Sequence, residues 1–495
     1  MTRRSPPRCV TMVRMASRTV ICCSVVAGCA VGPNFVRPDP PAGKSLTAGV
    51  LPAQTMLADG TAQRFVSGQK VTANWWQLFA CPELDAVVAD SLARSPTLES
   101  ARATLRMSQD TLRAGYGVFF PQASLAAGAN REKYNPAPGL VQAPTTPFNL
   151  FTVSASVSYA IDIWGGQRRQ LEALRAQSEN QRYALAASYI MLSGNVVNAV
   201  VARAAYRAEM DATIASIDLL REQLRITRAQ AAGGTVSYAN VLSIQSQMAS
   251  MEATLPPLAQ KMDQAADLLA ILSGRLPSEG TGSVIALTSL TLPVDLPLSL
   301  PSELVRQRPD VLQAEAMLHA ANAGIGVATA AMLPSLTLSA GYGIAGTSSG
   351  SGPFWNVGAG LEQPLFDAGT LWYQRKAAIE ARAVALGGYR QTVLSAFQQV
   401  ADTLRGLQHD AETLHAETEA VDAADGALRL VQANYAAGVS NYLQVLVADA
   451  QYLLAKTGYV QAVGQRLQDT VALYLALGGG WWDAPIEKEP DRRAR

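Results

Sequence analysis

The sequence has few of the side chains on which most enzymes depend. It contains 3 histidines and 5 cysteines among 495 residues. His409 and His415 are six positions apart, so on one helix they would lie on different faces. No HExxH, CxxC or GxSxG motif and no glycine-rich phosphate loop is present. We therefore predict that the protein is not an enzyme, and we expect no metal site and no enzymatic cofactor.

Charge of one sign and long hydrophobic runs are also scarce. Charged residues make up 16% of the chain, hydrophobic residues 49%, and the formal net charge is +1. No basic stripe with interleaved aromatic residues is present, so we expect no nucleic acid and no other polyanionic partner. Outside a short N-terminal segment there is no uninterrupted apolar run of the roughly 18 residues that a membrane helix needs. If this protein crosses a membrane, strands must do so.

The N-terminal residues resemble an export signal that ends in a lipobox. Basic residues between Arg3 and Arg18 precede an apolar segment, Thr19–Ala27. The segment Val26-Ala27-Gly28-Cys29 then resembles the lipobox of bacterial lipoproteins. This resemblance implies that residues 1–28 are removed as a signal peptide. It also implies that Cys29 receives a diacylglycerol and an N-acyl lipid, with palmitate as the expected acyl group.

Several alternatives at this end of the chain stay open. Ala30 follows the cysteine, which suits sorting to the outer membrane, but an ordinary cleaved signal with an incidental cysteine is also possible. Translation begins at Met1 or at Met12. Cys81 is the only cysteine that remains after processing and acylation, so the mature chain can form no intrachain disulfide. We expect Cys81 to be a small buried residue.

A long proline-free stretch predicts a very long helical hairpin. No proline occurs between Gly369 and Gly478. From Val393 to Leu414, apolar residues recur at alternating steps of four and three, which is the period of a left-handed coiled coil. Gly438 stands where a tight turn needs a residue with positive φ. A helix from Gly369 to about Ala436 would be roughly 100 Å long.

The same unit occurs twice along the chain. Gly234 and Gly438 are 204 positions apart (438 − 234), and so are Leu242 and Leu446 (446 − 242). Anchors at a constant offset indicate an internal duplication. We predict a signal peptide (1–28), an extended N-terminal arm with a Trp75-Trp76 anchor (29–80), a first repeat (81–274), a connector (275–300), a second repeat (301–479) and a polar tail (480–495).

Each unit also contains two strand-like segments. Between Phe151 and Ile163, apolar residues alternate with small polar residues. This pattern is typical of a barrel strand with a lipid-facing side and a wet interior. Similar segments lie around 336–344 and 355–361. A soluble sandwich is the alternative, but two strands between long helices cannot cover their own edges.

Together these features resemble the TolC-type outer-membrane efflux factors, and within them the lipoprotein branch that contains OprM and NodT. The segments that carry the resemblance are Cys29–Phe35, Trp75–Phe79, Arg308–Val311, Gln363–Phe366, Gly438–Leu443 and Ala476–Trp481. The resemblance implies a mixed α/β membrane protein, an internally duplicated unit of long coiled-coil helices plus two β-strands. It also implies a homotrimer that forms a twelve-stranded β-barrel on a periplasmic α-barrel.

The resemblance implies a passive channel in the outer membrane, anchored by lipid, with its helical barrel in the periplasm. Substrates would reach it from an inner-membrane pump through a periplasmic membrane-fusion adaptor. We expect a pump of the RND class, although the sequence does not distinguish this class from others or reveal the exported compounds. The alternative is a lipid-anchored periplasmic coiled-coil adaptor or structural envelope protein without a pore, which would leave the strand pairs unexplained.

In this family the helix–turn–helix tips dock the adaptor and close the pore. The matching tip residues are Gly233, Gly234, Thr235, Ala437, Gly438 and Val439. The matching periplasmic gate residues are Asn240, Tyr435, Leu443, Gln444, Leu446 and Val447. The family places an acid at position 240, an arginine at position 440 and acids at positions 444 and 447. This chain has Asn240, Ser440, Gln444 and Val447 there, so the gate is predicted to be neutral.

Our hypothesis for the gate combines apolar packing with one neutral hydrogen bond. Leu443, Leu446 and Val447 would pack together, and Tyr435 would bond to Asn240. Such a neutral bond contributes about 1 kcal/mol, roughly half of what a bond to a charged group contributes. Asp449 would be a displaced ring of charge. The alternative is that these residues are ordinary coiled-coil core and surface.

Overall fold

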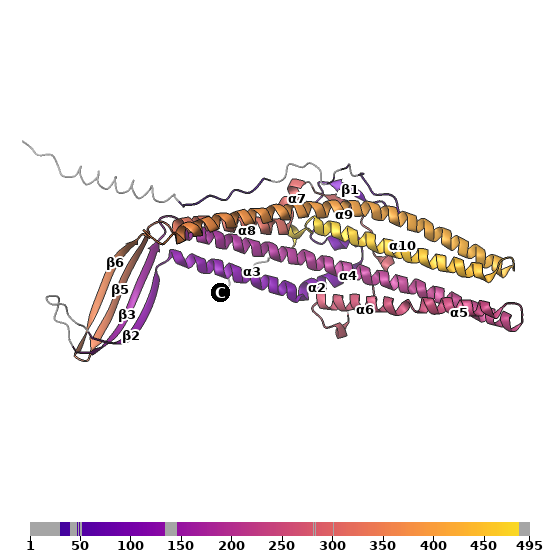
Figure 1. Ribbon diagram of the computed structural model, residues 1–495, viewed down its shortest axis with the longest axis horizontal. Coiled ribbons are helices and arrows are strands. Elements are labelled where there is room, and N and C mark those ends of the chain that lie inside the picture. The colour runs from indigo at the N-terminus through magenta and orange to yellow at the C-terminus, as the bar shows by residue number, and fades with distance from the viewer. Residues whose placement is uncertain are drawn as a thin grey trace, which may run out of the picture. The chain divides into compact units, whose positions relative to one another are not determined.

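The computed structural model describes residues 30–39, 47, 49, 52–133, 146–280, 282, 284–299 and 301–484 (Figure 1). The expected signal peptide, Cys29 and most of the expected polar tail lie outside these residues. The chain forms two compact units, which are treated separately below. The strand unit comprises the described residues up to Pro38 together with Leu105–Gln181 and Ala314–Tyr389, and the hairpin unit comprises the rest.

Two helices of equal length dominate the chain. Helix α4 spans Gly166–Ala232 and helix α9 spans Thr370–Ala436, and each contains 67 residues. Each begins directly after a glycine with positive φ, +78° at Gly165 and +86° at Gly369. Their starts are 204 positions apart (370 − 166), the offset that the sequence anchors predicted. At 1.5 Å per residue each helix is about 100 Å long, as expected for α9.

Apolar spacing alone predicts one helix in each of three further segments, but prolines divide each of them in two. Glu83 to about Val118, Glu303 to Met332 and the return from Gly234 to Ser273 each form two helices. The pairs are α2 (Pro82–Arg94) and α3 (Pro96–Gly115), α7 (Pro301–Gln307) and α8 (Pro309–Ala330), and α5 (Tyr238–Glu252) and α6 (Leu255–Leu272). Each second helix has proline at its first or second position, where a missing N–H costs nothing. Helix α10 (Tyr442–Ala476) contains no proline and is continuous.

Four strands of the strand unit form one antiparallel sheet. They are β2 (Gln122–Glu132), β3 (Phe148–Ile161), β5 (Ser335–Thr347) and β6 (Gly350–Glu362), in the order β2-β3-β5-β6 (Figure 1). The two predicted strand pairs are therefore joined through β3 and β5. Both edge strands, β2 and β6, have one unpaired side within the described sheet.

The register of this sheet separates an apolar face from a small polar face. Ala155 of β3 lies opposite Tyr342 of β5, which in turn lies opposite Trp355 of β6, so one apolar row crosses three strands. Trp355 is 75% exposed although it is a large aromatic side chain. On the other face the hydroxyls of Ser124 and Ser156 are 2.8 Å apart. The alternation predicted from the sequence therefore holds across the sheet.

The hairpin unit orders part of the arm that was expected to be without regular structure. Strand β1 (Arg64–Ser67) pairs in parallel with β4 (Asp295–Leu298), so the arm and the connector form a two-stranded sheet. Trp75 and Phe79 are fully buried, which agrees with the predicted tryptophan anchor. The Trp75 ring stacks on Tyr474 of α10 at a centroid distance of 5.4 Å.

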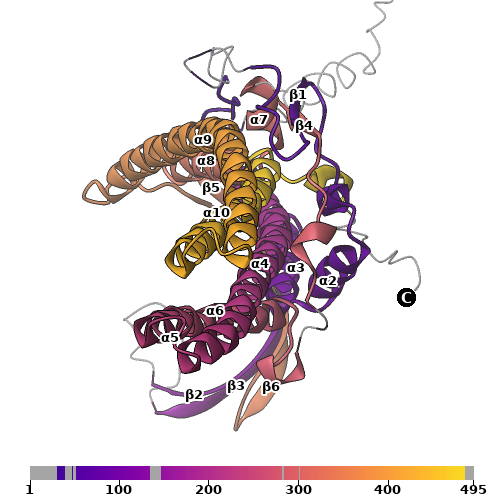
Figure 2. The same ribbon diagram turned by 90° about the vertical axis from the view of Figure 1, so that its right-hand side faces the viewer.

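Helix α4 contains the most apolar helical segment in the described part of the chain. An 18-residue window in it has a mean hydropathy of 1.5, which would suffice for a membrane span by composition. However, 67% of this window is buried inside the protein, as is common for a core helix. Both views show α10 alongside the later part of α9 (Figure 1 and Figure 2).

Candidate functional site

The two helical tips of the hairpin unit have the same backbone geometry. Gly234 and Gly438 both have φ of +73°. The Thr235 amide donates to the Gln230 carbonyl at 3.0 Å, and the Val439 amide donates to the Asn434 carbonyl at 2.9 Å. These bonds close the ends of α4 and α9 in the manner of a Schellman cap, which needs positive φ at the glycine. The predicted tips are therefore tight turns, and an adaptor-docking role for them stays a prediction.

At each tip a side chain caps the start of the next helix, and the two capping residues are 204 positions apart in the sequence (441 − 237). Ser237 Oγ accepts the Ala239 amide at 3.2 Å at the start of α5. Asn441 Oδ1 accepts the Gln444 amide at 3.2 Å at the start of α10. Serine and asparagine are the side chains that best satisfy free amides at a helix start. Duplication has thus preserved the turn chemistry as well as the helix lengths.

A shared apolar core joins the helices next to the tips. It contains Ile217, Leu220, Leu224, Val241, Ile244, Met251, Tyr442, Val445 and Leu446. Leu446 is only 4% exposed, so it belongs to this core within one chain. Leu446 therefore packs within its own hairpin unit, as the coiled-coil-core alternative expects, and its packing with Leu443 and Val447 in a closed gate stays a prediction.

Other predicted gate residues lie on an exposed face of α10. Leu443 and Val447 are each 62% exposed and lie one helical turn apart. Gln444 is also exposed. Exposed apolar side chains at this spacing form a stripe that is available for contact with another surface. Leu443, Gln444 and Val447 thus remain candidates for a gate, which stays a prediction.

The expected hydrogen bond between Tyr435 and Asn240 is not made within the chain. The Tyr435 hydroxyl donates instead to Gln230 Oε1 at 3.1 Å. Tyr435 precedes its tip glycine by three residues and Gln230 precedes Gly234 by four, so the two lie near the same distance from the tips. Asn240 lies beyond the turn, at the start of α5. The similar number of residues between each side chain and its tip glycine is the sequence signal that could have indicated Gln230 as the partner of Tyr435.

Asp449 does not lie on the exposed face and cannot supply a ring of charge there. It is 3% exposed, and neither carboxylate oxygen has a hydrogen-bond partner within the described part of the chain. Burial raises the pKa of Asp449 to about 6. Burial and the nearby Asp449 charge also raise the pKa of Tyr442, whose hydroxyl is likewise unpaired there.

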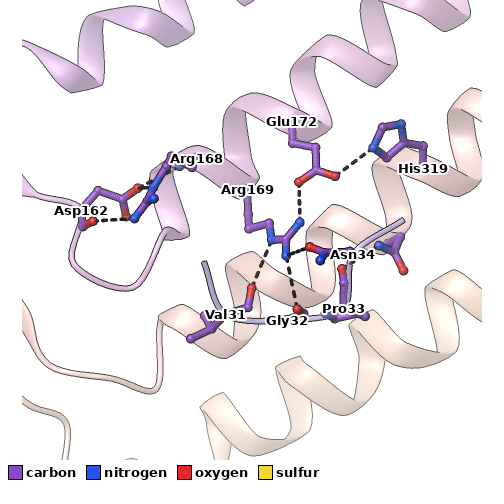
Figure 3. Close-up of polar contacts among 10 residues, drawn as sticks. Val31, Gly32, Pro33, Asn34, Asp162, Arg168, Arg169, Glu172 and His319 are labelled. Atoms are coloured by element: carbon purple, nitrogen blue, oxygen red, sulfur yellow. Dashed lines mark hydrogen bonds and ion pairs between the residues drawn. The ribbon is translucent and has the colours of Figure 1, made fainter. Parts of the chain in front are cut away.

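A second polar site lies in the strand unit, and sequence reasoning missed it. Buried Arg169 near the start of α4 donates hydrogen bonds to Val31, Gly32 and Asn34, which lie just after the expected lipid attachment site in the sequence (Figure 3). Cys29 itself lies outside the described residues. Among the residues that the structure describes, no group of three or more histidine, cysteine or acidic side chains could hold a metal ion.

The fold and the tips define an outer-membrane channel subunit of the TolC type. A family model described as "Outer membrane efflux protein" matches residues 87–275 and 300–479. The chain belongs to this family of outer membrane efflux proteins. It is an outer-membrane channel component of an efflux system, and the family expected from the sequence is confirmed.

Individual relatives and solved structures agree with this assignment. The Pyoverdine export outer membrane protein OpmQ of Pseudomonas aeruginosa is 31% identical over 445 residues, which cover 87% of this chain and 93% of OpmQ. The Probable outer membrane lipoprotein SilC of Salmonella typhimurium is 27% identical over 92% of this chain and 97% of SilC. The solved structure of the outer-membrane channel OprN has a TM-score of 0.81 and 26% identity, with coverage of 92% of this chain and 100% of OprN.

Proposed function

We propose that three copies of this chain form a closed trimeric duct that conducts small molecules passively to the exterior. The observation that supports this most directly is the four-stranded sheet with two open edges and opposite faces of different polarity. In a membrane every backbone group needs a partner, so β2 and β6 must pair with neighbouring copies. Three copies give twelve strands, with the apolar row toward lipid and the small polar face toward water.

The tips supply the proposed gate and docking surface. Leu443 and Val447 are exposed on α10, which supports a role for them in contacts between the three copies at the gate. The Tyr435–Gln230 bond ties the end of α9 to the end of α4 in each copy. The turns at Gly233–Thr235 and Ala437–Val439 are the proposed docking surface for a periplasmic adaptor. An inner-membrane pump, with the RND class as the expected one, would load the duct.

The proposed cargo is a small molecule whose identity the pump selects. The names of relatives refer to different compounds, since OpmQ is described as a pyoverdine export protein and TtgF as a toluene efflux pump protein. A passive duct whose cargo is selected by the pump would accept such different molecules. We therefore assign no particular compound to this chain.

The proposed membrane anchor is an N-terminal lipid on Cys29. The lipobox at residues 26–29 supports this, as does the description of SilC as an outer membrane lipoprotein. A covalent acyl chain adds about 0.8 kcal/mol of membrane affinity per buried CH₂ group, so two or three chains anchor firmly. The lipid would supplement the barrel and would not replace it.

Single-channel recording in planar bilayers tests the duct and the gate together. We expect the purified trimer to show a small, flickering conductance that increases clearly when Leu443 is replaced by serine. The matched control is Leu454→Ser, because Leu454 is a similarly exposed leucine (67%) further along α10. A folded trimer that never conducts would refute the duct. Equal conductance of both variants and wild type would refute the role of Leu443 but not the duct.

A further inference from the structure

A buried arginine in the strand unit binds the first described residues of the chain. Arg169 on α4 is only 5% exposed. Its guanidinium donates to the carbonyl of Val31 at 3.1 Å, the carbonyl of Gly32 at 3.2 Å and Asn34 Oδ1 at 2.8 Å (Figure 3). It also pairs with Glu172 at 2.7 Å. A guanidinium presents several donors in one rigid fork, so Arg169 can bind two backbone carbonyls and one side-chain oxygen of this segment at once.

Helix α8 holds the same segment through a second buried polar side chain. Asn322 is 2% exposed, and its Nδ2 donates to the Pro33 carbonyl at 2.9 Å. Its Oδ1 accepts a hydrogen bond from Arg382 Nε of α9 at 3.0 Å. The arginine can only donate, so it fixes the orientation of the amide and directs the Asn322 NH₂ group toward the segment. Side chains of both repeats therefore bind the same stretch of chain.

An aromatic contact extends this binding by one more residue. The Phe35 ring stacks on His319 of α8 at a centroid distance of 4.3 Å and an interplanar angle of 14°. His319 Nε2 lies 2.8 Å from Glu172 Oε1, so the histidine is held by the carboxylate that also pairs with Arg169. Burial raises the pKa of Glu172, but the hydrogen bonds from Arg169 and His319 outweigh burial, and the pKa lies below its ordinary value. Glu172 thus links the arginine to the stacked histidine.

Two glycines allow the backbone of the segment to touch helix α8. A Cβ at Gly326 would lie 2.6 Å from Arg169 Cγ and 2.9 Å from the Val31 carbonyl oxygen. A Cβ at Gly32, which has φ of +92°, would lie 2.5 Å from the Cα of Gly326. Contacts this short do not occur for real Cβ atoms, so any larger residue at position 326 must displace either Arg169 or the segment.

The start of the segment is fixed against the turn that joins β3 to α4. The Val31 amide donates to the Trp164 carbonyl at 2.9 Å. A Cβ at Gly165 would lie 2.6 Å from Ala30 Cα, so these two backbones are in direct contact. The Trp164 indole donates in turn to the Pro334 carbonyl at 2.8 Å, immediately before β5. The segment therefore begins at the end of the sheet where β3 finishes and β5 starts.

We propose that Arg169, Glu172, His319, Asn322 and Gly326 form an anchor clamp, a docking site that holds residues 30–35 and fixes acylated Cys29 at the Gly165 turn. This inference rests on the proposed lipidation of Cys29. Ala30 directly follows the proposed acylation site in the sequence, so holding residues 30–35 limits where the lipid can insert. The side chains of the clamp are positioning residues for the lipid, because they act on Cys29 through the backbone that follows it.

The clamp determines where the acyl chains can enter the bilayer. An undocked segment 30–38 could extend by about 30 Å, at roughly 3.4 Å per residue, and the lipid could then insert well away from the barrel. With the clamp occupied, the lipid enters beside the strand ends of its own subunit. The clamp thus keeps the lipid next to the strands of its own subunit.

Hydrogen exchange with mass spectrometry on the full-length protein, purified as the trimer from outer membranes, tests the clamp. The key variant is Gly326→Ala, and the matched control is Gly324→Ala, two residues away on the same helix, where a Cβ would meet nothing within 4 Å. Alanine is the better helix former at both positions, so helix propensity cannot explain a difference between them. We expect exchange in the peptide 29–37 to become faster by about tenfold or more in Gly326→Ala and to stay unchanged in Gly324→Ala.

The same spectra separate the clamp from the lipidation on which it rests. The mass of the N-terminal peptide reports whether Cys29 carries its acyl groups. An acylated trimer in which both glycine variants exchange like wild type would overturn the clamp. An unmodified Cys29 with exchange that still depends on Gly326 would overturn the lipidation and leave only a peptide-docking site. Should Gly326→Ala fail to assemble, Arg169→Gln replaces it, with the same expected loss of protection.

Discussion

Replacing Asp449 with asparagine is expected to stabilise the tip of the α9–α10 hairpin at neutral pH. The side chain is 3% exposed and neither carboxylate oxygen has a partner in the described part of the chain. Burial raises its pKa from 3.8 to about 6. A raised pKa means that the folded tip favours the neutral acid, so the tip loses stability as the pH rises from about 4 to about 6 and keeps that loss above it.

The size of this effect follows from the two pKa values. Above the folded pKa the penalty is about 3 kcal/mol, since each pKa step corresponds to about 1.4 kcal/mol. At pH 4.5 the same relation leaves a penalty of about 1 kcal/mol, because the folded form is then mostly neutral. Burying an unpaired amide also costs free energy, but this cost does not depend on pH. The gain from Asp449→Asn should therefore be about 2 kcal/mol larger at pH 7.5 than at pH 4.5.

Local hydrogen exchange of the α10 amides near Asp449 measures this difference directly. Correcting each rate for the intrinsic pH dependence gives the opening equilibrium of the tip. We expect the ratio of wild-type to variant opening constants to be about 25-fold larger at pH 7.5 than at pH 4.5. Asp402→Asn is the control for the same change from carboxylate to amide at an exposed position of α9.

An equal ratio for Asp449→Asn at both pH values would contradict the raised pKa of Asp449. That result would mean that the Asp449 carboxylate is either hydrated or paired in the assembled protein. If the variant were less stable than wild type by the same amount at both pH values, the raised pKa would also be refuted. Only the difference in stability that changes with pH reports the charge of Asp449.

Three further predictions concern the tips and the anchor clamp. Tyr435→Phe and Gln230→Leu should each raise the open probability in planar bilayers by about fivefold, the equivalent of one neutral hydrogen bond of about 1 kcal/mol. Asn240→Ala should leave the open probability unchanged. An effect of Asn240→Ala alone would instead support a hydrogen bond between Tyr435 and Asn240. Glu172 has a lowered pKa, so its contribution to the clamp is present above pH 4.5 and is lost as the pH falls below that value. Peptide 29–37 should accordingly be protected from hydrogen exchange above pH 4.5 and lose this protection below it. Glu172→Gln should abolish this pH dependence. Gly234→Ala and Gly438→Ala should each destabilise their own tip by about 1–2 kcal/mol, measured by local hydrogen exchange. The φ angle is +73° at both glycines and an added Cβ would meet nothing within 4 Å, so only backbone strain contributes. A clearly unequal loss at the two tips would indicate contacts with another chain.

Periodicity predicted those features that depend on local pattern. The start of α9 at Thr370, the alternating faces of β3 and the burial of Trp75 follow from spacing and residue type within a few positions. The breaks before Pro96, Pro256 and Pro309 were missed, although proline at the first turn of a helix is a local signal. Apolar periodicity continues across such a break, so the pattern alone predicted single helices.

The polar contacts of the site could not be predicted in the same way. Arg169 binds residues more than 130 positions away, and its backbone partners Val31 and Gly32 carry no side-chain signal. Gln230 replaces Asn240 as the partner of Tyr435 because the two helices run side by side from equally placed turns. Asp449 was read as exposed charge, although Leu446 one turn earlier and Asp449 share the buried side of α10. Which polar groups meet depends on the relative height of neighbouring helices, which a single sequence does not contain.

The duplicated hairpins differ in whether the buried position held by Asp449 can ionise. Turns, caps and helix lengths recur at the offset of 204 residues, so the two tips begin with equal backbone stability. At the same offset, however, Asp449 of α10 corresponds to Gln245 of α5 (449 − 245). A glutamine does not ionise, so the charge penalty falls on α10 alone, close to the exposed Leu443 and Val447 stripe. At this buried position, therefore, only the α9–α10 hairpin has a side chain that takes up protons, while α5 has a neutral amide there.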